Sequence, residues 1–78
     1  MTHLEIKHLL DCRGLKCPIP IIKTRKAIGD LNSGDVLKMM ATDPGSINDV
    51  KAWAKRTGNT VLKEEHRENE FIFLILKK

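Results

Sequence analysis

Two prolines, Pro18 and Pro20, constrain where this chain can form a helix. Proline has a fixed φ angle and no N–H group, so it fits the first turn of a helix and disrupts the interior. Apolar side chains recur at helical spacing after Pro20, and they predict a helix over residues 18–31 whose first residue is Pro18. The residues expected on its buried face are Ile21, Ile22, Thr24, Ala27, Ile28 and Leu31.

Strands are predicted on both sides of this helix. Residues 4–10 alternate loosely between apolar and polar side chains, and residues 36–42 are mostly apolar after an Asn-Ser-Gly-Asp stop signal at 32–35. A strand, a helix and a second strand of these lengths form a βαβ unit, which is right-handed and has parallel strands. In the first strand, the inward-facing residues are expected to be Leu4, Ile6 and either Leu9 or Leu10.

The pattern after residue 42 predicts a second helix. It opens either at Pro44 after an Asp43 cap or at a competing cap on Ser46. Gly58 follows the last helical residues and is expected to end the helix as a C-terminal glycine cap. The side chains expected along its buried stripe are Ile47, Val50, Ala54 and Thr57, with Trp53 at the edge.

The last two strands are predicted over residues 60–65 and 71–76, joined by a turn at 67–70. All six residues of the last strand are apolar, so either it is central and covered on both faces or its second face meets a partner. The element order βαβαββ predicts one α+β domain over residues 1–78. Its expected architecture is a two-layer sandwich, with a mixed four-stranded sheet and both helices on one face. Weak self-association is expected at the open face of the sheet.

The net charge of +4 restricts the partners only weakly. Binding of nucleic acid normally needs a denser basic patch or stacking aromatic side chains, so no direct contact with nucleic acid is expected. The N-terminal residues lack the features of a secretory signal, and no run of about 18 apolar residues occurs, so we expect a cytoplasmic protein without membrane contact. The basic residues near the first helix form either a solvated surface or a docking surface for an acidic partner: Arg13, Lys16, Lys23, Arg25 and Lys26.

Cys17 is the strongest candidate for chemistry because it stands at or next to the expected cap of the first helix. Free backbone N–H groups, the positive end of the helix dipole and the neighbouring cations Arg13 and Lys16 each favour thiolate over thiol. The sequence therefore predicts a lowered pKa and a reactive cysteine at this position. The alternative is a small buried hydrophobic residue, which is a common role of cysteine.

The other candidates for chemistry have less support from their spacing. Cys12 either ends the first strand as an inward-facing residue or meets Cys17 across the loop as a second thiol. None of the three histidines is placed to supply a base to Cys17. Because neither the histidines nor the cysteines have the spacing of a metal site, no metal is expected. Asp43 is expected only to cap a helix.

The residues around Cys17 resemble the signature of the TusA/SirA family of small sulfur-carrier proteins. That signature is a Cys-Pro-x-Pro motif preceded by an Asp and a Gly in a short loop. In this chain it consists of Asp11, Gly14, Cys17, Pro18 and Pro20. The resemblance extends over nearly the whole chain and includes the element order, a Ser-Gly-Asp turn at 33–35, an Ala-Thr-Asp-Pro segment at 41–44 and a glycine after the second helix.

The resemblance implies a sulfur carrier rather than a self-contained enzyme. In such a carrier, Cys17 accepts sulfane sulfur as a transient persulfide from a cysteine desulfurase, a rhodanese or a related donor and passes it to an acceptor protein, without a cofactor. The pathways of the family include tRNA thiolation, molybdenum-cofactor supply and dissimilatory sulfur metabolism, and the two-cysteine loop inclines us to the last. Two alternatives stay open, namely a non-catalytic regulatory or interaction module and a thiol redox protein that uses Cys12 and Cys17.

Overall fold

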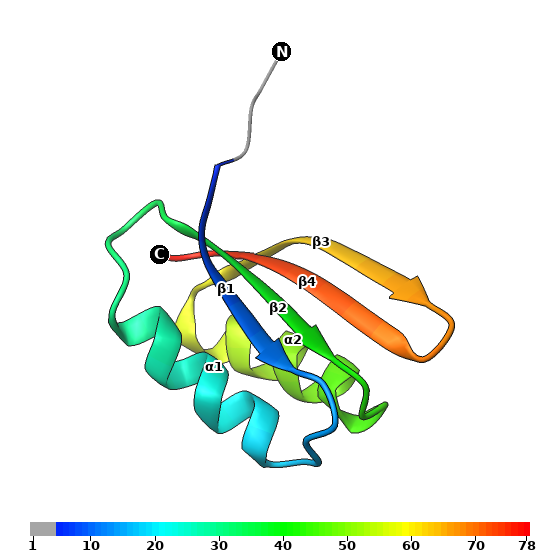
Figure 1. The fold of residues 1–78 in the computed structure, drawn as a ribbon. Coiled ribbons are helices and arrows are strands. Elements are labelled where there is room, and N and C mark those ends of the chain that lie inside the picture. Colours follow the sequence, from blue (N-terminus) through cyan, green and yellow to red (C-terminus); the bar gives the residue numbers. More distant parts are fainter. Residues whose placement is uncertain (1–4) are drawn as a thin grey trace.

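The computed structural model describes residues 5–78, which form one mixed sheet with two helices on one of its faces (Figure 1). The strand order is β1-β2-β4-β3, in which β1 and β2 are parallel and the other neighbouring pairs are antiparallel. The predicted fold class is therefore confirmed. The elements are β1 (Ile6–Cys12), α1 (Ile19–Gly29), β2 (Val36–Ala41), α2 (Gly45–Thr57), β3 (Thr60–Arg67) and β4 (Glu70–Leu76).

The parallel pair β1 and β2 positions the loops that follow both strands. Their register places Cys12 opposite Ala41, so both strands end at the same edge of the sheet. The loop from β1 to α1 and the loop from β2 to α2 therefore begin side by side, as Figure 1 shows at the lower right. Polar groups at the carboxyl ends of adjacent parallel strands meet in this way because the strands run in the same direction.

The helix boundaries differ from the predicted ones by one or two residues at α1 and agree at the end of α2. α1 begins at Ile19 rather than Pro18, because the N–H of Ile19 donates to the carbonyl of Lys16 in a separate turn before the helix. At its other end, the N–H of Leu31 donates to the carbonyl three residues earlier, which closes a tighter final turn. α2 ends at Thr57 and is capped by Gly58, whose φ of 83° is the left-handed conformation that glycine adopts freely.

The core lies between the sheet and the helices. Leu37 and Met39 of β2 and Phe73 and Ile75 of β4 are fully buried there, packed against side chains from both helices. Trp53 was predicted at the edge of the α2 stripe, but it belongs to the core and is only 2% exposed. Burying an aromatic ring of this size removes about 150–250 Å² of surface from water.

Three predicted inward positions are wrong. Ile22 on α1 is 54% exposed and Thr57 at the end of α2 is also exposed, because each lies beyond the arc of its helix that the sheet covers. Ile6 on β1 is 43% exposed, because an irregularity in the register between Ile6 and His8 reverses the alternation of the strand. Leu10 faces inward as one of the two options predicted, and Leu4 lies outside the described residues.

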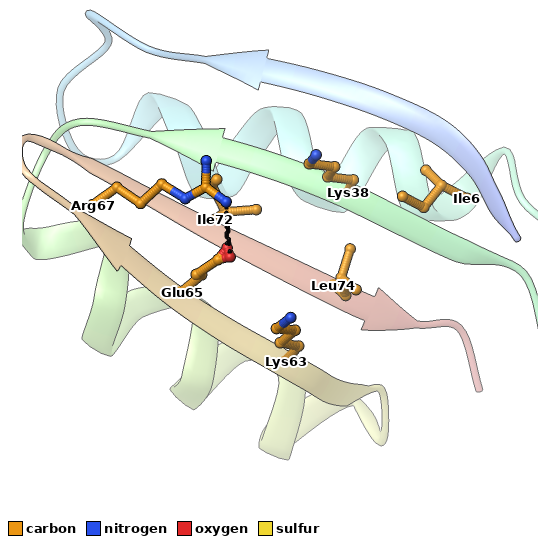
Figure 2. A pocket seen from close by; sticks show the side chains of 7 residues that line it. All are labelled: Ile6, Lys38, Lys63, Glu65, Arg67, Ile72 and Leu74. Carbon is orange, nitrogen blue, oxygen red and sulfur yellow. Dashed lines mark hydrogen bonds and ion pairs between the residues drawn. The ribbon is translucent and has the colours of Figure 1, made fainter. Parts of the chain in front are cut away.

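The last strand is central, but the helices cover only one of its faces. On the other face, Ile72 and Leu74 are half-buried and form the apolar floor of a hollow of about 220 Å³. Figure 2 shows Lys38, Lys63 and the ion pair between Arg67 and Glu65 around this floor, with the helices behind the sheet. Self-association through this open face stays a prediction, and sedimentation velocity at rising protein concentration checks it: a constant monomeric coefficient would rule it out.

Within residues 5–78, neither helix has the length and apolar character needed to cross a bilayer.

The division between the covered and the open face predicts the stability of two matched variants. Ile75→Ala removes a fully buried side chain from the core and is expected to lower the free energy of unfolding by about 2–5 kcal/mol. Leu9→Ala removes a side chain that is 57% exposed and is expected to cost less than about 1 kcal/mol. Urea unfolding of both variants measures the difference, and equal losses would contradict the assignment of the faces.

Candidate functional site

The loop that carries Cys17 is attached to the neighbouring β2–α2 loop by two hydrogen bonds. The backbone N–H of Cys17 donates to Oδ2 of Asp43 at 2.8 Å, and the N–H of Gly14 donates to Oγ1 of Thr42, also at 2.8 Å. Gly14 has a φ of 82°, which is a strained conformation for any residue with a side chain. The motif glycine therefore turns the loop so that its N–H groups meet the polar side chains after β2.

The thiol of Cys17 is exposed and has a carboxylate as its hydrogen-bond partner. Its Sγ donates to Oδ2 of Asp49, on α2, over a distance of 2.7 Å. Asp43 holds the backbone of the same residue, so two carboxylates lie beside one cysteine. The sequence predicts only a capping role for Asp43 and does not identify Asp49 as a site residue. No local signal identifies Asp49, because it lies 32 residues away along the chain.

These carboxylates raise the pKa of the Cys17 thiol, whereas the sequence predicts a lowered pKa. The hydrogen bond to Asp49 raises the pKa of the thiol above its ordinary value, and desolvation and the negative charges of Asp49 and Asp43 act in the same direction. The nearby cation Arg13 does not compensate, because its guanidinium pairs with Asp11 and Glu70. The prediction of a lowered pKa at this position is therefore wrong.

The start of α1 also offers the thiol fewer free N–H groups than expected. The N–H of Ile19 is bonded to the carbonyl of Lys16, and Pro20, in the first turn, has no N–H group at all. The prolines that begin the helix thus remove part of the positive N-terminal field that normally stabilises a thiolate. Cys17 lies two residues before the first helical residue, with the Cys17–Pro18 peptide bond in the cis form.

A hollow of about 280 Å³ adjoins the Cys17 thiol between the two helices. α1 and the turn before it contribute Pro18 and Ile21 to its lining, and α2 contributes the rest. Its walls are mostly apolar, with Asp49 next to the thiol and Arg56 two helical turns further along. The α2 residues that line it are Asp49, Ala52, Trp53 and Arg56.

The other motif residues have structural roles around the same loop. Asp11, at the end of β1, accepts hydrogen bonds from Nε, Nη2 and the backbone N–H of Arg13 at 2.9–3.0 Å. These hydrogen bonds lower the pKa of Asp11 to about 2. Pro20, in the first turn of α1, is buried, whereas Pro18 is exposed beside the hollow.

The second thiol is placed differently from the first. Cys12 is fully buried at the end of β1, where its Sγ lies 4.0 Å from the carbonyl oxygen of Pro20. Burial raises the pKa of the Cys12 thiol. Both cysteines are free, with Cys17 exposed and Cys12 inside the core. This arrangement agrees with the inward-facing strand residue that was one of the two interpretations of Cys12.

The predicted docking residues lie on the surface near the loop and along α1. Arg13 is committed to Asp11 and Glu70 in two ion pairs. Lys16, Lys23, Arg25 and Lys26 are exposed. Their use in docking stays a prediction.

In residues 5–78, the hydrogen-bond partner of the Cys17 thiol is Asp49 and not a histidine. His66 pairs with Glu64 and packs its ring edge-on against Phe71, while His8 is exposed on β1, and His3 lies outside the described residues. Across residues 5–78 there is no group of three or more His, Cys, Asp or Glu side chains that could hold a metal ion.

Comparison with known proteins shows the family to which this chain belongs. The model of the family described as "Sulfurtransferase TusA" matches residues 8–77, which include both loops of the site. The chain belongs to the TusA family. The TusA sulfur carrier protein of Allochromatium vinosum is 46% identical over 68 residues, which are 87% of this chain and 90% of that protein.

One relative is much longer than this chain, and one solved structure shares its fold. YrkF of Bacillus subtilis, described as a putative sulfur carrier protein, is 49% identical over 90% of this chain, but the match spans only 37% of YrkF. A SirA-like protein from Desulfitobacterium hafniense has the same fold, with a TM-score of 0.75 over 88% of this chain and 93% of that chain. Because its sequence identity to this chain is only 24%, this likeness concerns the fold alone.

The Asp11–Arg13 contact predicts a measurable change in titration. Replacing Arg13 by Gln removes the guanidinium that depresses the Asp11 carboxyl, so the pKa of Asp11 is expected to rise from about 2 toward its ordinary value of 3.8. In the unchanged protein, this contact favours folding above the unfolded pKa of Asp11, and its contribution is lost as the pH falls through about 2.

NMR titration of the Asp11 carboxyl group follows this change. Arg25→Gln is the matched control, because Arg25 has no part in the Asp11 shift. An Asp11 pKa that stays near 2 in Arg13→Gln would show that another group is responsible.

Proposed function

We propose that this TusA-family chain is a sulfur carrier that accepts sulfane sulfur as a persulfide on Cys17 and passes it to a partner protein. The observation that carries the proposal is an exposed thiol on a loop held in place by Asp43 and Thr42, within the residues that match the family model. The relatives named sulfur carriers support the same role.

The chemistry of such a transfer suits a site without a catalytic base. The Cys17 thiolate attacks the outer sulfur of a donor persulfide, the donor S–S bond breaks, and the donor cysteine leaves as a thiolate that takes up a proton. Cys17–SH and donor–S–SH thereby become Cys17–S–SH and donor–SH, so neither an oxidant nor a cofactor is consumed. The handover step repeats this exchange with the acceptor thiol as the nucleophile.

The proposed partners are a sulfur donor protein, either a cysteine desulfurase or a rhodanese, and an acceptor protein. The expected docking surface for them comprises the exposed loop and the cationic side chains along α1. Among the pathways of the family, we favour dissimilatory sulfur metabolism over tRNA thiolation and molybdenum-cofactor supply. The two free thiols fit a reducing cytoplasm, and recovery of the protein from the periplasmic fraction would contradict that location.

Intact-mass measurement after incubation with polysulfide tests the persulfide. The protein is expected to gain the mass of one sulfur atom, and dithiothreitol is expected to remove it. Cys17→Ser should abolish the gain, whereas Cys12→Ala should retain it because Cys12 is buried. A gain that persists in Cys17→Ser would falsify the proposal. No gain in any form, together with partner binding that is insensitive to alkylation of Cys17, would favour a regulatory module.

A further inference from the structure

We propose that Asp49 holds the unloaded Cys17 as an unreactive thiol, and that a cationic side chain of the sulfur donor releases it by entering the hollow beside Asp49. This inference rests on the proposed carrier function and assigns a control step to it. A carrier without such control would offer its nucleophile to any electrophile or oxidant, because Cys17 is exposed.

The hydrogen bond from Cys17 to Asp49 is the holding contact. A thiol can donate to a carboxylate, but a thiolate cannot, so the 2.7 Å contact exists only while Sγ carries its proton. Asp43, bonded to the backbone N–H of Cys17, adds a second negative charge on the other loop. The pKa of the thiol is raised accordingly, and the charged groups responsible are both carboxylates.

The hollow is shaped to admit a side chain with an apolar stem and a charged end. Pro18, Ile21 and Trp53 provide apolar walls, and Asp49 lies among them beside the thiol. Lysine and arginine have such stems, and their charged ends pair readily with carboxylates. The chain's own Arg56 also lines the hollow, but it forms no ion pair with another described residue.

Pairing of Asp49 with a donor cation changes the reactivity of Cys17. The carboxylate then interacts with the cation, so the proton of Sγ passes to solvent and the thiolate is available to attack the donor's outer sulfur. After transfer, Sγ is bonded to the second sulfur and has no hydrogen for Asp49. The holding contact therefore applies to the empty carrier and is absent from the loaded one.

Two variants imitate the release without any partner. Asp49→Asn removes the negative charge. Ala52→Lys places a cation three residues after Asp49 on the same face of α2, at an exposed position that lines the hollow. Asp30→Asn is the control, because it removes an exposed acidic charge just after the far end of α1.

The measurements are the pH profile of Cys17 alkylation by iodoacetamide and the thiolate absorbance titration. Both release variants should shift the profile to lower pH. At pH 7.5 they should raise the alkylation rate about threefold, because a lower thiol pKa increases the thiolate fraction by more than it reduces the nucleophilicity of each thiolate. Asp30→Asn should match the unchanged protein, and circular dichroism verifies that every variant is folded.

Two outcomes would overturn the inference. Slower alkylation in Asp49→Asn would show that the carboxylate acts as a base that assists Cys17. An unchanged pH profile of alkylation in Ala52→Lys would contradict the proposal that a cation near Asp49 releases Cys17. Alkylation involves no sulfur transfer, so these results are independent of the polysulfide experiment: loss of sulfur loading bears on the carrier function, and the alkylation profile bears on Asp49.

Discussion

The parallel pairing of β1 with β2 is the constraint on which the rest of the site depends. Because Cys12 and Ala41 lie opposite each other, the two strands end together and release their loops at one edge of the sheet. The side chains of Thr42 and Asp43 can then accept hydrogen bonds from the backbone N–H groups of Gly14 and Cys17, respectively. A shift of β1 by one residue against β2 would move these partners apart and would also turn Leu10 and Cys12 away from the core.

The electrostatics of Cys17 are decided by its nearest neighbours rather than by the net charge of the chain. The chain carries a net charge of +4, yet the groups that act on this thiol are two carboxylates. Proline at the start of α1 provides rigidity, but it also removes N–H donors that would stabilise a thiolate. Rigid presentation of the cysteine and stabilisation of its thiolate are therefore separate properties. This loop holds Cys17 rigidly but does not stabilise its thiolate.

The two faces of the sheet have different roles in the molecule. The helix-covered face holds the core, with Phe73, Ile75 and Trp53 buried. The open face combines an apolar floor with lysine and arginine side chains (Figure 2). Cys17 belongs to the helix side, so contacts on the open face would leave the thiol and its adjoining hollow accessible.

Local patterns in the sequence were sufficient for the element order and the fold class. Strands, helices and caps follow from the spacing of apolar residues and from proline and glycine, which act over a few residues. The pKa direction of Cys17, the role of Asp43 and the involvement of Asp49 were not predictable in this way. They depend on charges brought together across 26 and 32 residues of chain, and only the packing of α2 beside the loop of Cys17 decides which charges those are.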